Sequence, residues 1–130
     1  MSLEVVRGVG VPTSTLPFSP GIRAGGFVFV SGQASVDDTG AIVNDTFAGE
    51  FHRSLDNVRK VLAGAGLTLA DVVQVRSYVD SPADLAEYNR LYREAFAAPF
   101  PARTTIVNCL GGALKYEIDV VAFDSANAKG

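Results

Sequence analysis

One arginine and one glutamate are the side chains best suited to chemistry in this sequence. Arg103 follows Pro101 and opens an apolar segment, and Glu117 opens a second such segment after a glycine pair at 111–112. The pattern predicts two short strands joined by a glycine turn. A guanidinium is a fixed fork of donors whose natural partner is a planar carboxylate. Arg103 therefore either pairs with Glu117 and pins this hairpin, or binds the carboxylate of a small ligand near Glu117, and the spacing leaves both open.

Other reactive side chains are few. His52 is the only histidine and Cys109 the only cysteine, so the sequence offers no cluster at metal-ligand spacing and no intrachain disulfide. Cys109 is interpreted as a small buried core residue, and His52 as a surface residue of a helix. Ser31 has no accompanying histidine and aspartate arrangement, which argues against nucleophilic catalysis by its hydroxyl. The glycine pairs at 25–26 and 111–112 fit hairpin turns better than phosphate-binding loops.

Length and composition limit the classes of function. The 130 residues carry a net charge of -3, with 48% hydrophobic and 19% charged residues. These values predict a single domain spanning residues 1–130. The acidic balance argues against nucleic acid and anionic membranes as partners. The sequence shows neither a signal peptide nor an apolar run of membrane-spanning length, so we expect a cytoplasmic protein.

The periodicity of the apolar residues predicts both strands and helices. Residues 3–9, 22–32 and 72–79 favour strands, the second region being a hairpin about Gly25 and Gly26, and the third having Val73, Val75 and Val79 on one side. Two helices are expected, one from Asp45 and one from a serine cap at Ser81. Their apolar stripes consist of Phe47, Phe51, Leu55, Val58 and Leu62 in the first helix and of Leu85, Tyr88, Tyr92 and Phe96 in the second.

The order of the expected elements is three strands, a helix, a strand, a helix and two strands (βββαβαββ). Each helix has one apolar stripe, so we expect both to cover one face of a mixed sheet in a two-layer α+β domain. The other face would present one large apolar patch, which burial against further copies of the chain would remove. The sequence therefore predicts a homo-oligomer with this patch at its interfaces: Phe27, Phe29, Tyr78, Val121 and Phe123.

Short motifs in this order resemble those of the RidA (YjgF) family of enamine/imine deaminases, also called the endoribonuclease L-PSP family. The similarity covers nearly the entire chain, and the Pro101-Ala102-Arg103 segment with its downstream Glu117 is its most specific part. The other matching segments are 16–19, 30–33, 54–58 and 88–89. The resemblance implies a chorismate-mutase-like fold, a homotrimer with clefts at the subunit interfaces, a small 2-imino or 2-oxo acid as ligand, and no cofactor or metal.

The resemblance also assigns roles to residues that could act on the ligand. Arg103 would bind the carboxylate of a 2-imino acid, and Glu117 would position the water that attacks the C=N carbon. The main chain of Thr105 would hold the substrate, although the family commonly has a cysteine at this position. Phe18 stands where the family commonly has a tyrosine, so it could pack against a ligand but could not donate a hydrogen bond.

Three further residues belong to the expected substrate-binding site. Ser31 and Gly32 offer a hydroxyl and an uncluttered backbone beside the same cleft, while a serine at a strand end is also a common turn residue. Asn89 either lines the cleft from a neighbouring subunit or bridges backbone groups at an interface.

The leading functional hypothesis is hydrolysis of reactive enamine and imine intermediates of the 2-aminoacrylate (2-iminopropanoate) type to 2-oxo acids and ammonia. Phe18 leaves room for an alternative, a deaminase of a larger enamine acid of the aminomuconate type. A trimer that binds a carboxylate metabolite without catalysis is the third possibility. Ribonuclease or translation-inhibitor activity, also described for the family, has little support from this acidic chain with one histidine.

Overall fold

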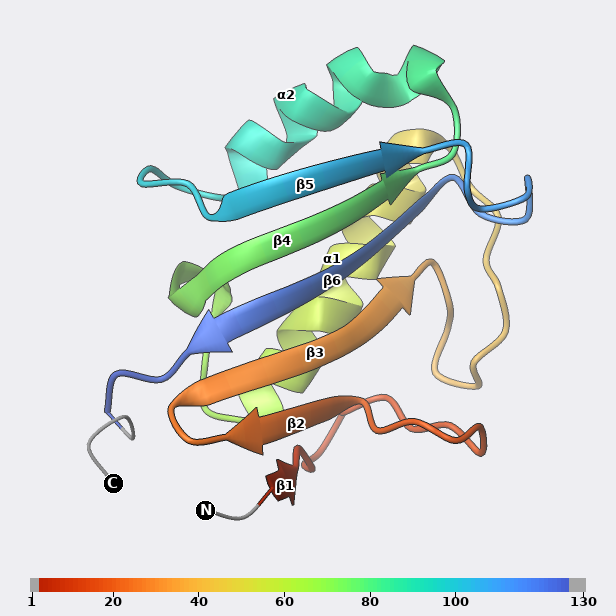
Figure 1. The fold of residues 1–130 in the computed structure, drawn as a ribbon. Helices are drawn as coiled ribbons and strands as arrows, with labels where there is room; N and C mark the ends of the chain where they lie inside the picture. Colours follow the sequence, from red (N-terminus) through yellow and green to blue (C-terminus); the bar gives the residue numbers. More distant parts are fainter. Residues whose placement is uncertain (1–2, 127–130) are drawn as a thin grey trace.

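The computed structural model describes residues 3–126, which form one mixed sheet and two helices (Figure 1). The strand order is β1-β2-β3-β6-β4-β5, in which β4 and β5 are parallel and the other neighbours antiparallel. The strands are β1 (Leu3–Val5), β2 (Gly21–Ala24), β3 (Phe27–Ala34), β4 (Val72–Val79), β5 (Ala102–Val107) and β6 (Tyr116–Phe123). The predicted α+β class and element order are confirmed.

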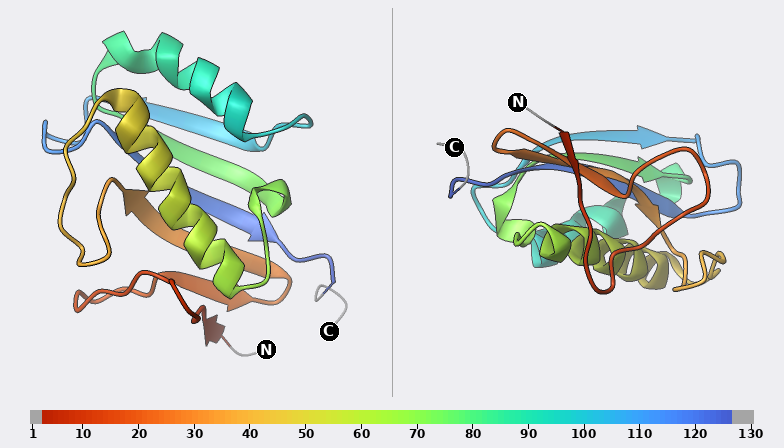
Figure 2. Two further views of the ribbon diagram at one scale, coloured as in Figure 1. Left: turned by 180° about the vertical axis from the view of Figure 1, so that it is seen from behind. Right: turned by 90° about the horizontal axis from the view of Figure 1, so that it is seen from below.

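Both helices lie on the same face of the sheet, as the turned views show (Figure 2). They are α1 (Phe47–Gly64) and α2 (Leu85–Ala95), with single 3-10 turns η1 (Leu69–Asp71) and η2 (Pro82–Asp84) elsewhere. All five residues of the predicted stripe of α1 are buried. None of the helices in the described part of the chain is both long and apolar enough to cross a membrane.

Polar side chains mark where the helical segments begin. The Thr46 side chain accepts a hydrogen bond from the Gly49 amide at 3.1 Å, so α1 starts two residues after the predicted position. Ser81 caps as predicted, with the Ala83 amide as donor at 3.3 Å, but the segment it caps is η2 and α2 follows at Leu85. A proline at the first position supports either kind of turn, which is why the sequence did not separate them.

The predicted hairpin between the Arg103 and Glu117 strands is wrong. β4 lies between them, so that Arg103 pairs with Val75 and Glu117 with Tyr78. Asp80, at the end of β4, holds the connection that crosses β4: its carbonyl accepts from the Asn108 amide at 3.0 Å, and its carboxylate accepts from the Leu110 amide at 3.0 Å. The glycines at 111–112 turn the chain within this crossing, with φ of 67° and 84°.

Two further details differ from expectation. A register shift between Val72 and Gln74 turns Val73 away from the helix side, so Val73 is exposed while Val75 and Val79 are buried. Cys109 is exposed rather than buried, because it lies in the β5–β6 connection outside both layers. The predicted hairpin about Gly25, whose φ is 61°, is confirmed between β2 and β3.

The face of the sheet opposite the helices carries the predicted apolar patch. Phe27 and Phe29 are 43% and 47% exposed, and the Phe27 ring lies 5.1 Å from that of Phe123. Beside them Asp119 accepts from Arg76 and from the Tyr78 hydroxyl, both at 2.8 Å. Burial of this patch in a homo-oligomer remains a prediction.

A buried carboxylate joins α1 to the beginning of β6. Glu50 lies in the first turn of α1 and is fully buried. Its carboxylate accepts from the Lys115 amide at 2.9 Å and the Asp45 amide at 3.1 Å, and the Lys115 ammonium lies 3.3 Å away. Since Lys115 is two residues before Glu117, this cluster fixes where β6 starts.

Glu50→Gln is expected to lower the free energy of unfolding by about 2–3 kcal/mol, because an amide would place donors against these donors in a buried site. Urea denaturation of both proteins measures the difference. The control is Glu87→Gln, which removes the exposed 3.6 Å pair with Arg90 and an acidic charge in the first turn of α2, and which should cost less than about 1 kcal/mol. Equal losses in the two variants would contradict a special role for Glu50.

Candidate functional site

Arg103 projects from β5 toward α2. Its backbone pairs with Val75, a buried residue whose side chain is on the helix side of the sheet. The guanidinium carbon lies 5.0 Å from the ring centroid of Tyr88 and 4.7 Å from that of Tyr92. A cation over two buried aromatic faces is attracted by their negative π surface. The two tyrosines therefore orient the guanidinium without using its hydrogen-bond donors.

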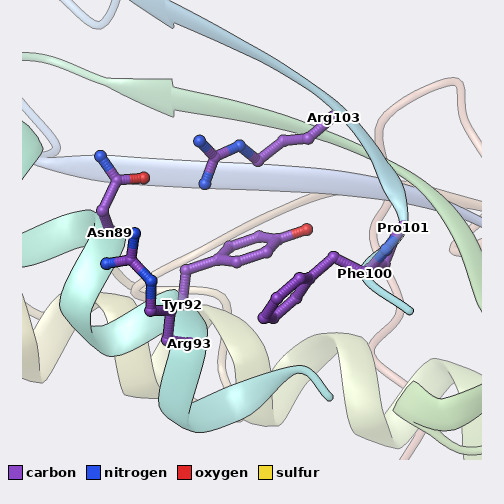
Figure 3. A pocket seen from close by; sticks show the side chains of 6 residues that line it. All are labelled: Asn89, Tyr92, Arg93, Phe100, Pro101 and Arg103. Atoms are coloured by element: carbon purple, nitrogen blue, oxygen red, sulfur yellow. The ribbon is translucent and has the colours of Figure 1, made fainter. Parts of the chain in front are cut away.

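Arg103 and Tyr92 border a cavity of about 270 Å³, here called the Arg103 pocket (Figure 3). Arg103 and Arg93 both line it, and neither forms an ion pair with a carboxylate within residues 3–126. Two such guanidinium groups favour an anionic ligand. The residues that line the pocket are Asn89, Tyr92, Arg93, Phe100, Pro101 and Arg103.

Glu117 lies on the opposite face of the sheet from Arg103. Its neighbours Tyr116 and Ile118 are buried on the helix side, so the alternation of β6 directs Glu117 to the other face. The Glu117 carboxylate lies against Gly32 of β3: a Cβ atom at Gly32 would come within 2.6 Å of the Glu117 Oε2 atom, so a side chain there would displace the carboxylate. Partial burial and, to a smaller extent, the charge of Asp119 raise the pKa of Glu117 above its ordinary value of 4.5.

Phe18 and Ser31 lie on the Gly32 side. Phe18 and Gly32 line a second cavity of about 390 Å³, and the Phe18 side chain is 52% exposed. The Ser31 hydroxyl donates to the Ser19 carbonyl at 2.5 Å, so its proton is used to fasten the loop that carries Phe18. This bond fits the expectation of a structural role for Ser31 at least as well as ligand binding.

The predicted site residues thus fall into two groups in one chain. Arg103 and Asn89 share the Arg103 pocket, and the Thr105 hydroxyl lies 3.2 Å from that of Tyr88, beneath the guanidinium. Glu117 belongs with Gly32 and, through it, with Phe18 and Ser31. An ion pair between Arg103 and Glu117 within the chain is absent from the described residues, and their opposite faces rule it out.

Tyr92, Arg93 and Phe100 line the Arg103 pocket and Tyr88 contacts Arg103, and none of them was predicted as part of a site. Tyr88 and Tyr92 were expected as members of a buried helical stripe, Tyr88 also belongs to a segment that carries the family resemblance, and both are buried. Their hydroxyl groups were the sequence signal that could have indicated a polar neighbour, because a helical stripe that packs only on aliphatic side chains does not require tyrosine. Arg93 carries no sequence signal of its own, since its role depends on which strand lies beside α2.

The hydroxyl of Tyr92 has no hydrogen-bond partner among the described residues, although it is buried. Burial chiefly, and the neighbouring Tyr88, raise the pKa of Tyr92 to about 12, while Arg103 acts in the opposite direction. The phenol is therefore neutral at physiological pH. Within residues 3–126, no histidine, cysteine, aspartate and glutamate side chains gather in a group that could hold a metal ion.

Tyr92→Phe is expected to leave the free energy of unfolding unchanged or to raise it by up to about 1 kcal/mol, because it removes an unsatisfied buried hydroxyl and keeps the ring. Tyr116→Phe is the matched control, since the Tyr116 hydroxyl bonds to that of Ser77 at 2.9 Å. That change should cost about 1 kcal/mol. Denaturant unfolding measures both, and a larger loss for Tyr92→Phe than for Tyr116→Phe would contradict the unsatisfied hydroxyl.

Comparisons with known proteins cover almost the whole chain. The family model described as endoribonuclease L-PSP matches residues 10–124. The chain is 34% identical over 122 residues to a RutC family protein of Pyrococcus horikoshii, with 92% of this chain and 97% of the relative covered. It is 35% identical over 124 residues to the 2-iminobutanoate/2-iminopropanoate deaminase of Salmonella typhimurium, covering 92% and 96%.

A solved structure agrees with this result. A protein of unknown function of the conserved Rid family from Yersinia pestis superposes with a TM-score of 0.86 at 27% identity, covering 94% of this chain and 99% of the other. The region matched by the family model, residues 10–124, includes the elements that carry both groups of site residues.

Proposed function

Because this chain belongs to the Rid family (YjgF, endoribonuclease L-PSP), we propose that it hydrolyses 2-imino acids and their enamine tautomers to 2-oxo acids and ammonia. The observation that carries the proposal is Arg103, a guanidinium that is oriented by two tyrosine rings, lines a pocket and has no acidic partner within residues 3–126. The Salmonella relative bears the name of this activity, which supports the choice of reaction.

The reaction requires a bound carboxylate and a placed water. Arg103 binds the substrate carboxylate through paired charge-assisted hydrogen bonds, which fixes the adjacent C=N carbon. The oxygen of water bonds to this carbon while Glu117 accepts a water proton and passes it to the nitrogen. The hydroxyl proton of the resulting carbinolamine is then transferred to its nitrogen, the C–N bond breaks, ammonia leaves, and the carbonyl of the 2-oxo acid forms. One water is consumed, and the reaction involves no oxidation or reduction.

The proposal includes an assembly, because Arg103 and Glu117 of one chain lie on opposite faces of the sheet. A complete site therefore joins Arg103 of one copy to Glu117 of a second copy, in a cleft at a subunit interface. We propose the homotrimer expected for this family. The exposed Phe27 and Phe29 on the Glu117 face supply an apolar surface suited to such an interface.

An amino-acid oxidase that releases imino acids from alanine or 2-aminobutanoate tests the activity. Semicarbazide captures the free imine, so an active protein lowers the initial rate of semicarbazone formation and accelerates ammonia release. A rate identical to that of buffer, with folded protein present at a concentration comparable to that of the oxidase, would refute imine hydrolysis. Binding of 2-oxobutanoate without turnover would instead identify a carboxylate-binding protein.

A further inference from the structure

We propose that the Arg103 pocket prefers imino acids that carry a second carboxylate, and that Arg93 binds this second group. The inference rests on the proposed function, in which Arg103 binds the first carboxylate. It names the substrate class of that same site, a short dicarboxylic 2-imino acid.

The geometry places two guanidinium groups on one cavity. Arg93 projects from α2 and Arg103 from β5, and both line the Arg103 pocket. Asn89 is four residues before Arg93, so the two lie on the same side of the helix. Figure 3 shows the Asn89 amide at the end of the pocket toward which both guanidinium groups extend. Hydrogen-bond donors from α2 and β5 thus face the same pocket.

Arg93 and Arg103 differ in their ion pairing from the other arginine of α2. Arg90, on the same helix as Arg93, is held by Glu94 at 3.2 Å and Glu87 at 3.6 Å. Arg93 and Arg103 have no such partner within the described residues. The two positive guanidinium groups repel each other across the pocket, and a ligand with one carboxylate neutralises only one of them. A dicarboxylate neutralises both.

The position of Arg93 in the last turn of α2 does not account for this arrangement. A cation at the end of a helix is favoured by the helix dipole, and this benefit needs no contact with a pocket. The cavity of about 270 Å³ lies just below the range of about 300–1,000 Å³ for drug-sized ligands. It suits an acid of a few carbons, whose chain the rings of Tyr92 and Phe100 can cover.

Calorimetric titration with 2-oxoglutarate and 2-oxobutanoate, the products from a dicarboxylic and a monocarboxylic imino acid, tests the preference without requiring turnover. The wild-type protein should bind 2-oxoglutarate more tightly. In Arg93→Gln the ratio of the two affinities should fall by about tenfold to a hundredfold, as expected for the loss of a charge-assisted hydrogen bond. Arg93→Lys keeps the charge and should retain part of the ratio.

Arg90→Gln is the matched control, because Arg90 is an exposed, paired arginine of the same helix that does not line the pocket. The ratio of the affinities of Arg90→Gln for 2-oxoglutarate and 2-oxobutanoate should equal that of the wild-type protein. The same ratio is then measured as kcat/KM for imino acids released from glutamate and from 2-aminobutanoate. An unchanged ratio in Arg93→Gln, or a wild-type preference for the monocarboxylate, overturns the inference. Tight 2-oxoglutarate binding that depends on Arg93, without hydrolysis of either imine, refutes the proposed function and leaves the anion preference standing.

Discussion

Arg103→Ala is expected to lower kcat/KM for imine hydrolysis by about a hundredfold to ten-thousandfold. Two charge-assisted hydrogen bonds to the substrate carboxylate would be lost, each with a free energy of about 1.5–3 kcal/mol. The loss should be distributed over KM and kcat, because an unclamped carboxylate also leaves the C=N carbon poorly placed for water. Steady-state kinetics with a coupled imine source measures both parameters.

The folded state should be nearly unaffected by this change. Arg103 contributes its packing on the rings of Tyr88 and Tyr92 and forms no ion pair within the described residues. Such contacts are worth about 1 kcal/mol at partly exposed sites. Arg59→Ala, which removes an exposed arginine paired with Asp56 at 2.8 Å, is the control with unchanged activity. Activity of Arg103→Ala within threefold of the control would contradict the clamp.

The opposite faces of Arg103 and Glu117 also make the shared site directly testable. Arg103→Ala and Glu117→Gln subunits, each expected to have very low activity alone, can be unfolded together and refolded as a mixture. Mixed assemblies would contain some interfaces with both native residues, so activity should reappear in proportion to their number. Mass spectrometry verifies that mixed assemblies have formed. If they recover no activity, then either both residues of a site come from one subunit or one of the two residues takes no part in the reaction.

The fold was predictable where the sequence repeats one signal many times. Five apolar residues of α1 share one stripe, and each supports the same helix and the same buried face. The partner of a strand has no comparable signal. The segments of Arg103 and Glu117 follow each other along the chain, and the usual pairing of sequence neighbours favoured a hairpin. The structure instead inserts β4, and the bonds of Asp80 to the connection had no recognisable sequence pattern.

The sequence allowed the main site residues to be identified, but it predicted their positions relative to one another only in part. The charges of Arg103 and Glu117 and the missing side chain of Gly32 are properties of single residues, so sequence patterns and family resemblance could identify them. Which face each side chain occupies depends on the strand order and on the pairing register, in which Arg103 lies beside Val75 and Glu117 beside Tyr78. The aromatic support from Tyr88 and the place of Arg93 depend in addition on α2 lying beside β5. These are tertiary facts without a local sequence signal.

Glu117→Gln is expected to lower kcat by about a hundredfold to ten-thousandfold, the usual contribution of a positioned general base. The carboxylate is the form that accepts a proton from water. Burial and the charge of Asp119 raise the pKa of Glu117 above 4.5, so wild-type kcat/KM should fall as the pH decreases through this raised pKa. The variant should lack this dependence, because an amide does not titrate. The pH profile of kcat/KM for both proteins is the measurement.

Glu117→Gln should lower activity but raise the free energy of unfolding at neutral pH. A raised pKa in the folded state means that folding binds the Glu117 proton more tightly, so the free energy of unfolding falls as the pH rises from 4.5 through the folded pKa. This loss is complete above the folded pKa and absent in Glu117→Gln. The variant should therefore gain stability relative to the wild-type protein as the pH rises from acidic to neutral. A difference in stability that does not vary with pH would show that Glu117 ionises as freely as in the unfolded chain, and that it is not the desolvated carboxylate required of the base.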